Sequence, residues 1–248
     1  MKTWVVIPAR YGSTRFPGKP LVKIAGVPLL ERVIQKVQKA QGVDRILVAT
    51  DHAEIESLCR GLKIAVVQTD SHLTSGTDRI FQALQKSDDL VSDDDLIINV
   101  QGDEPLLPAS WIEGLAKAFR ENPRYQMGTL AHPLTWEELE NPNSVKVLCD
   151  QDQFALYFSR YPIPHSREKS GGRPVSLKHI GVYAFRYSVL KRFCQLPPSE
   201  IEKAESLEQL RALQAGIRIW VMSVEGSIQG VDVPDDVQKV EKILRGSV

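Results

Sequence analysis

In the first half of the chain, short apolar runs alternate with longer amphipathic stretches. The apolar runs lie at residues 4–9, 45–50, 64–68, 96–100 and 127–131, and their length and β-branched content predict strands. Apolar side chains recur at helical spacing between these runs, which predicts helices at residues 28–41, 53–60, 77–85 and 110–120. Continuous apolar strands that alternate with helices indicate a mostly parallel sheet covered by helices on both faces. The pattern is typical of a doubly wound α/β protein.

The alternation of strands and helices changes after about residue 133. Three strand-like runs, at residues 145–149, 156–159 and 179–185, follow one another with no helix predicted between them. Consecutive strands without a helical crossover favour antiparallel pairing. The polar segment 160–174, with three prolines and two adjacent glycines, predicts a loop between the last two of these strands.

Alternation resumes toward the C-terminus, with a helix predicted at 206–215, a strand at 217–221 and a last helix at 234–244. These elements continue the pattern of the first half. We therefore expect a main α/β domain formed by residues 1–132 together with 204–248, and an antiparallel subdomain, residues 133–203, inserted into it.

The composition excludes several classes of protein. The chain has 31 Lys and Arg against 31 Asp and Glu, a formal net charge of zero, which argues against a general nucleic-acid binder. No stretch approaches the roughly 18 apolar residues of a membrane span, and the N-terminal apolar run is too short for a signal peptide. Cys59, Cys149 and Cys194 are scattered without CxxC spacing, so we expect no disulfide framework, no thiolate metal cluster and a cytoplasmic location.

Charge is unevenly distributed along the chain, although its sum is zero. The first 30 residues contain five Lys or Arg and no acid. Most of these cations lie in PARYGSTRFPGKPL, residues 8–21, directly after the first predicted strand. Gly12 and Gly18 allow backbone N–H groups to turn toward an anion, and the cations supply charge, which favours a phosphate-binding loop. The spacing is neither that of a P-loop nor that of a dinucleotide fingerprint, and a charged surface turn is the alternative.

Two carboxylates follow later predicted strands. Asp103 lies in QGDEP, at the end of the strand 96–100, and Asp232 lies in GVDVPDD, before the last helix. Ligands of parallel sheets bind beyond the carboxyl ends of the strands, and Mg²⁺ prefers such hard oxygen ligands. The alternative is that Asp103 or Glu104, and likewise Asp232, simply marks the start of the helix that follows. A cationic loop with two separated aspartates would suit nucleotidyl transfer, in which charge stabilisation does most of the chemistry.

Seven motifs in order along nearly the whole chain carry a specific resemblance. They are PARYGSTRFPGKPL, SGTDR (75–79), NVQGDEP (99–105), ALYFSR with IP (155–160, 163–164), HIGVYAFR (179–186), ESLEQLRAL (205–213) and GVDVPDD (230–236). Together they resemble the 3-deoxy-manno-octulosonate cytidylyltransferases, the CMP-Kdo synthetases. The resemblance implies a Rossmann-like, three-layer nucleotide-diphospho-sugar transferase fold. It also implies transfer of the cytidylyl group of CTP to the acid sugar Kdo, with Mg²⁺, in a cytoplasmic homodimer that serves lipopolysaccharide synthesis.

The same resemblance assigns site residues by motif position. The main domain would bind the nucleotide, and the inserted subdomain would bind sugar and form the dimer. For the nucleotide it implies Arg10, Ser13, Arg15 and Lys19 on the phosphates, and Ser75, Gly76, Arg79 and Gln101 near cytosine and ribose. Asp103 and Asp232 would hold Mg²⁺, and these two, with Arg10 and Lys19, would be the catalytic residues. For the sugar it nominates Arg160, His179, Tyr183, Glu208 and Gln209.

Several of these residues have an alternative structural interpretation. Tyr183 and His179 could be ordinary core residues of a strand, and Glu208 could form an ion pair with Arg211 on one helix face. The group that takes the proton of the sugar hydroxyl stays open. Two rival functions also stay open: a cytidylyltransferase for another acid sugar, such as 8-amino-Kdo or a sialic acid, and a catalytically silent nucleotide-binding homologue.

Overall fold

The structure is a computed structural model that describes residues 1–12, 16–165 and 173–246. The chain divides into two compact units, the first formed by residues 1–118 with 228–248 and the second by residues 119–227. The second unit is therefore wider than the subdomain expected at 133–203. It includes the predicted strands at 127–131 and 217–221, because the first pairs antiparallel with the strand at residues 177–186 and the second pairs in parallel with the first.

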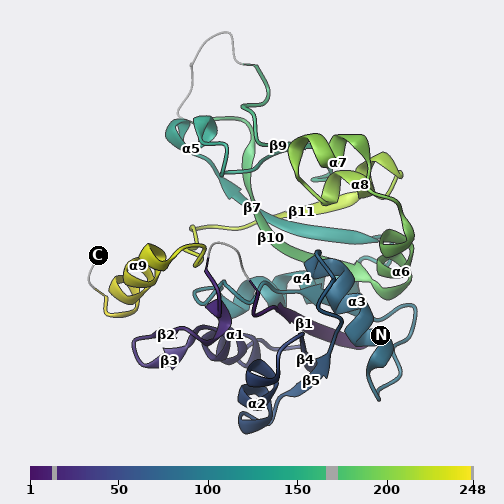
Figure 1. The fold of residues 1–248 in the computed structure, drawn as a ribbon. Helices are drawn as coiled ribbons and strands as arrows, with labels where there is room; N and C mark the ends of the chain where they lie inside the picture. The colour runs from purple at the N-terminus through teal and green to yellow at the C-terminus, as the bar shows by residue number, and fades with distance from the viewer. Residues whose placement is uncertain (13–15, 166–172, 247–248) are drawn as a thin grey trace. The chain divides into compact units, whose positions relative to one another are not determined.

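Parallel strands form the centre of the first unit (Figure 1). Strand β1 (Thr3–Ala9) pairs with β4 (Arg45–Thr50) on one side and with β6 (Leu96–Asn99) on the other, and β4 pairs with β5 (Ala65–Gln68). Every side chain of β6 is buried, and β1 is buried over nearly its whole length. The parallel order explains why these strands are continuous apolar runs in the sequence.

Three amphipathic helices connect these strands in sequence: α1 (Leu29–Gln38), α2 (Ala53–Gly61) and α3 (Gly76–Lys86). Two further helices, α4 (Ala109–Glu121) and α9 (Pro234–Leu244), follow β6 and the last strand of the chain. The apolar positions that predicted α1 are all buried. Short elements, η1 (Lys19–Leu21), β2 (Lys23–Ile24) and β3 (Val27–Pro28), lead from the end of β1 into α1.

The second unit is built on strands of both directions. Strand β7 (Met127–Pro133) runs parallel to β11 (Ile219–Ser223) and antiparallel to β10 (Leu177–Arg186). Strand β10 also pairs with β8 (Lys146–Cys149), which pairs with β9 (Ala155–Ser159), and both pairings are antiparallel. The expected fold class, mixed α/β with parallel strands and an antiparallel insertion, is confirmed.

Helices α5 (Trp136–Glu140), α6 (Tyr187–Gln195), α7 (Glu200–Glu205) and α8 (Gln209–Gln214) complete the second unit. The helix predicted at 206–215 is shorter than expected. Ser206 adopts a left-handed conformation, with φ of 51°, and ends α7, so α8 begins only at Gln209. No helix in the described parts of the chain is long and apolar enough to cross a membrane.

Candidate active site

A cavity of about 260 Å³ lies in the first unit, beyond the carboxyl ends of β1 and β6. It is lined by residues that follow β1, by η1, by the start of α3, by the segment after β6 and by Asp232. Among its lining residues are Arg10, Lys19, Ser75, Gly76, Arg79, Gln101, Asp103 and Asp232. The structure therefore brings together at one cavity all the described residues for which a nucleotide or metal role was predicted. Ser13 and Arg15 lie outside the described residues.

The ammonium group of Lys19 lies between the two predicted metal ligands. Lys19 Nζ is 2.6 Å from Asp103 Oδ2 and 3.9 Å from Asp232 Oδ1. The backbone N–H of Val231 donates to the carbonyl oxygen of Asp103 at 3.0 Å, which holds the two acidic segments side by side. Asp103 and Asp232, which are 129 positions apart in sequence, thus both lie close to the Lys19 ammonium group. They do so beyond the carboxyl ends of parallel strands, where ligands of such sheets usually bind.

Neither aspartate serves as a helix cap, the alternative that the sequence left open. Helix α4 begins only at Ala109, well beyond Asp103 and Glu104. At α9, Asp236 accepts hydrogen bonds from the N–H groups of Asp232 and Val233, at 3.0 and 3.1 Å. Asp236 therefore orders the start of this helix, and the side chain of Asp232, which is 69% exposed, is left to face Lys19 and the cavity.

The segment that leaves β1 is fixed at both ends. The N–H of Gly18 donates to the carbonyl of Tyr11 at 3.0 Å, and the N–H of Tyr11 donates to Asp51 Oδ1 at 3.2 Å. The Tyr11 ring stacks on His52, with ring centroids 3.9 Å apart. Gly18 has φ of 69°, which favours glycine, and a Cβ there would lie 3.5 Å from the Tyr11 ring. These contacts hold Tyr11 and Gly18, which flank the middle of the proposed phosphate loop, in place.

Arg79 is buried and its guanidinium is committed to the protein. It pairs with Asp51 at 3.0 Å and donates to Thr69 Oγ1 at 2.7 Å and to the carbonyl of Leu73 at 3.1 Å. Burial lowers the pKa of Arg79, and the negative charge of Asp51 partly offsets this effect. Although Arg79 lines the cavity, these bonds hold the segment before α3 against the end of β4. Sequence reasoning missed Asp51; its place directly after a parallel strand is the signal that could have found it.

Close backbone packing surrounds the start of α3. Ser75 caps the helix, because its Oγ accepts hydrogen bonds from the N–H groups of Thr77 and Asp78 at 3.1 and 3.2 Å. A Cβ on Gly76 would lie 3.4 Å from Pro8 Cγ, and one on Gly102 would lie only 2.9 Å from the Pro8 carbonyl oxygen. The N-terminus of this helix of 11 residues thus reaches the cavity, where its partial positive charge favours an anion.

The comparisons with known proteins agree with this geometry. A family model described as cytidylyltransferase matches residues 4–219. A 3-deoxy-manno-octulosonate cytidylyltransferase of Bdellovibrio bacteriovorus is 47% identical over 247 residues, 98% of each chain, and one of Escherichia coli is 40% identical over 243 residues, 98% of this chain and 96% of that one. The chain belongs to the 3-deoxy-manno-octulosonate cytidylyltransferase family. It is therefore an enzyme of the nucleotidyltransferase class.

Solved structures support the assignment to the cytidylyltransferases. A CMP:2-keto-3-deoxy-manno-octonic acid synthetase complexed with CTP matches with a TM-score of 0.92 and 39% identity, covering 100% of both chains. A cytidylyltransferase from Leptospira borgpetersenii matches with a TM-score of 0.66 at 15% identity, over 100% of this chain and 88% of that one, and shows the shared fold alone.

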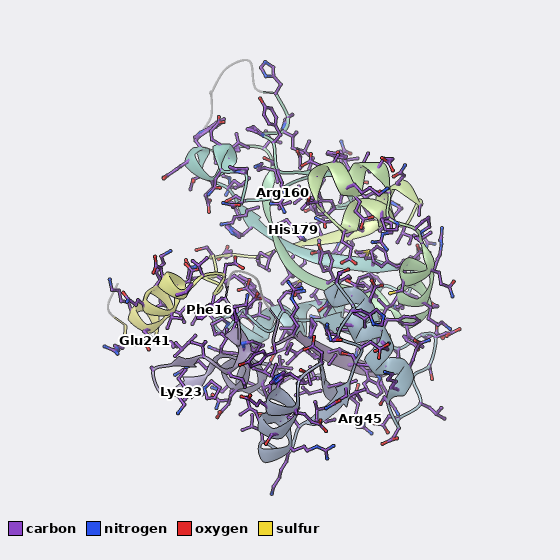
Figure 2. All side chains as sticks on the ribbon, viewed as in Figure 1. Phe16, Lys23, Arg45, Arg160, His179 and Glu241 are labelled. Carbon is purple, nitrogen blue, oxygen red and sulfur yellow. The ribbon has the colours of Figure 1, made fainter. Side chains whose placement is uncertain are left out.

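In this cytidylyltransferase, the residues predicted for the sugar all lie in the second unit (Figure 2 labels Arg160 and His179). His179 and Tyr183 are neighbours on β10, with ring centroids 5.4 Å apart. Burial lowers the pKa of His179 to about 3, so its ring is neutral at pH 7. Burial, reinforced by the negative charge of Glu208, raises the pKa of Tyr183 above its usual range.

The amide of Gln209 is a further polar group facing the interior of the second unit. Its Nε2 is buried and has no hydrogen-bond partner among the described residues. Arg211 forms an ion pair with Glu202, to which it donates through Nε at 2.8 Å and Nη2 at 2.5 Å. An unpartnered buried amide costs stability unless a ligand uses it.

Arg160 belongs to a partly buried hydrogen-bond network that sequence reasoning missed. Its guanidinium donates to the carbonyls of Glu205, Pro142 and Ser206, at 2.8, 3.2 and 3.4 Å. The Glu205 carboxylate accepts from the Arg160 N–H at 2.8 Å, and fully buried Lys146 donates to the Arg160 carbonyl. Three of the five N–H donors of the guanidinium are thus used within the part of the chain that the structure describes. Lys146 gave no sequence signal, because a lysine at the start of a strand usually faces solvent.

Proposed function

We propose that this chain transfers the cytidylyl group of CTP to the anomeric hydroxyl of Kdo and releases pyrophosphate. The observation that carries the proposal is the Lys19 ammonium, held between Asp103 and Asp232 in a cavity at the carboxyl ends of parallel strands. In the reaction, the hydroxyl oxygen bonds to the α-phosphorus of CTP while the bond from that phosphorus to the pyrophosphate oxygen breaks. Family membership and the CTP complex of the 39% identical synthetase support the choice of nucleotide and sugar.

The nucleotide would bind in the cavity of the first unit. Arg10 and Lys19, with Ser13 and Arg15, would hold the phosphates, and positive charge there would stabilise the departing pyrophosphate. Ser75, Gly76 and Gln101 would lie near cytosine and ribose. Arg79 would act on the nucleotide through the segment it holds, because its guanidinium is bound to Asp51 and Thr69.

We further propose that the enzyme uses Mg²⁺, with Asp103 and Asp232 as its protein ligands. The donor set fits: Mg²⁺ in nucleotide enzymes is commonly bound by one or two carboxylates together with substrate phosphates. The two carboxylates already share one cation, Lys19, within 4 Å of each. A bound Mg²⁺ would supply charge neutralisation at the phosphates. No group of three or more His, Cys, Asp or Glu side chains among the described residues forms a separate metal site.

The acid sugar would bind to Arg160, His179, Tyr183, Glu208 and Gln209. Arg160 would take the sugar carboxylate with its remaining N–H donors. The neutral ring of His179 and the unpartnered amide of Gln209 suit a ligand rich in hydroxyl groups. These five residues offer one cation, one carboxyl side chain and three neutral polar groups, which suits a ligand with one carboxylate and several hydroxyl groups.

The setting proposed for this reaction is the cytoplasm, where a homodimer would make CMP-Kdo for lipopolysaccharide. Leu156, Tyr161 and Val175 of the second unit are 62%, 77% and 81% exposed in the single chain. A homodimer that covers these large apolar side chains would remove them from water. This supports the second unit as the dimerisation part of the chain.

The test is a pyrophosphate-release assay over a panel of nucleoside triphosphates and acid sugars. We expect release with CTP, Kdo and Mg²⁺, and a loss of about 10²-fold or more in D103N and D232N. D235N, which changes an exposed aspartate three residues from Asp232, is the matched control and should keep its activity. Preference for 8-amino-Kdo or a sialic acid would support the first rival function. CTP binding without pyrophosphate release on any sugar would support a silent homologue.

A further inference from the structure

Thr129 of β7 lies under an irregularity in β10, next to the proposed sugar site. The pairing of the two strands shifts register between Ile180 and Tyr183. Thr129 is fully buried, and its Oγ1 lies within hydrogen-bond distance of three groups: the Val182 carbonyl at 2.8 Å, the Ile180 carbonyl at 3.2 Å and His179 Nε2 at 2.9 Å.

The direction of the Thr129 hydroxyl proton determines which tautomer of the His179 ring fits this contact. A hydroxyl has one proton, and a carbonyl oxygen can only accept. The proton therefore points to the nearer carbonyl, that of Val182, and the hydroxyl oxygen accepts from His179 Nε2–H. In the opposite arrangement the hydroxyl would donate to Nε2, and two oxygen lone pairs would face each other at 2.8 Å.

The second ring nitrogen of His179 is then an acceptor. Because burial lowers the pKa of His179 to about 3, the ring carries a single N–H at neutral pH, and Nδ1 has a lone pair. Within the described chain Nδ1 has no hydrogen-bond partner. The ring orientation is fixed by edge-to-face contact with Phe158 at 5.1 Å and by Tyr183 at 5.4 Å.

We propose that Thr129 is a positioning residue that holds His179 in the Nε2–H tautomer, so that His179 Nδ1 accepts a hydrogen bond from a hydroxyl group of the acid sugar. The proposal rests on the proposed function for the identity of that sugar. A carboxylate has no proton to donate at neutral pH and cannot bind an unprotonated nitrogen. His179 therefore recognises the polyol part of the sugar, and the carboxylate is left to Arg160.

The test combines NMR of histidine ring nitrogens with steady-state kinetics of the full chain. Long-range ¹H–¹⁵N spectra distinguish the two tautomers, and the spectrum of H179Q identifies the signals of His179. We expect protonated Nε2 in the wild type and in T129S, which keeps the hydroxyl. In T129V the Nδ1–H form should appear. The KM for Kdo should rise about tenfold, the effect of one neutral hydrogen bond, while the KM for CTP stays the same.

T3V is the matched control for loss of a buried strand hydroxyl, since Thr3 of β1 is also fully buried but lies in the first unit. It should lower stability without changing the KM for Kdo. Protonated Nδ1 in the wild type, or the same tautomer in T129V, would overturn the role of Thr129. An unchanged KM for Kdo in T129V would overturn the contact with the sugar. Absence of pyrophosphate release by the wild type would instead count against the proposed function, and the nitrogen spectra would still decide the tautomer.

Discussion

Lys19 occupies the place where the proposed metal would be attracted, and its removal gives the sharpest test of the site. Its ammonium lies 2.6 Å from Asp103 and 3.9 Å from Asp232. In the protein without nucleotide, Lys19 neutralises one of these two negative charges. A metal ion that enters the site must therefore compete with a cation that belongs to the chain. We predict that K19M binds a divalent cation more tightly than the wild type in the absence of CTP, although it loses activity.

The size of the effect follows from the exposure of the site. Asp103 and Asp232 are 31% and 69% exposed, so solvent screens their charges, and Lys19, at 16%, is the least exposed of the three. Two unit charges about 4 Å apart in water interact by about 1 kcal/mol, and a divalent ion doubles this value to about 2 kcal/mol. Removal of the ammonium should therefore strengthen metal binding roughly 30-fold. The free energy of unfolding should change by about 1 kcal/mol, because an ion pair that is still in contact with solvent contributes little.

The assay is titration of the nucleotide-free protein with Mn²⁺, followed by electron paramagnetic resonance of the unbound ion. K19R keeps the positive charge and should bind Mn²⁺ as the wild type does. K23M, which removes an exposed lysine of β2 (labelled in Figure 2), controls for the loss of one charge outside the cavity. In pyrophosphate release, K19M should be slower by about 10²–10³-fold. Equal or weaker Mn²⁺ binding by K19M would refute competition between Lys19 and the metal.

Two further substitutions test the packing and the capping around the cavity. In G102A the new Cβ would lie 2.9 Å from the Pro8 carbonyl oxygen. We therefore expect a loss of about 2 kcal/mol in the free energy of unfolding and a raised KM for CTP. The control is G61A, whose Cβ meets nothing within 4 Å; it should leave both quantities unchanged or raise the stability slightly. For Asp236, burial raises the pKa, but hydrogen bonds from Lys239 and two backbone N–H groups lower it overall, below its ordinary 3.8. The ionised Asp236 carboxylate therefore stabilises the fold at pH values above 3.8, and this stabilisation is lost as the pH falls through the lower pKa of the folded protein. The Tm difference between D236N and the wild type should be clear at pH 7 and shrink below about pH 4. A difference that does not depend on pH would contradict this reasoning.

Elements that carry their own hydrophobic pattern could be predicted from the sequence, and those defined by neighbours could not. The parallel strands and α1 are each a local signal, because their apolar spacing matches their burial. Helix α6 follows β10 directly, and its N-cap residue, Arg186, makes no side-chain capping bond, so nothing marks its start. Helix α7, which was not predicted, has a signal in the sequence, the capping box of Ser199 and Glu202.

The same distinction applies to the predicted site: residues with a local signal could be predicted, and their partners could not. Asp103 and Asp232 could be found because each follows a strand or precedes a helix in a Gly- and Pro-bounded segment. Partners such as Asp51 for Arg79, and Thr129 for His179, are chosen by the fold from distant parts of the chain, at separations of 28 and 50 residues. The place of Asp51 after a parallel strand could mark it as a site residue, but nothing in the spacing of these residues predicts which partner each one contacts.

The charge around the cavity differs from the charge of the N-terminal segment alone. The acid-free first 30 residues predict a locally cationic segment, yet in the fold Lys19 lies close to Asp103 and Asp232, which are far from it in sequence. The three side chains together have a formal net charge of −1. Arg10 also lines the cavity, is exposed and has no ion pair among the described residues, so we expect it to bind a phosphate. A triphosphate approaching this cavity meets an unpaired arginine beside an excess of negative charge. Its binding should therefore be stronger together with a divalent cation than without one, because that cation offsets the aspartates and releases Lys19 to the phosphates.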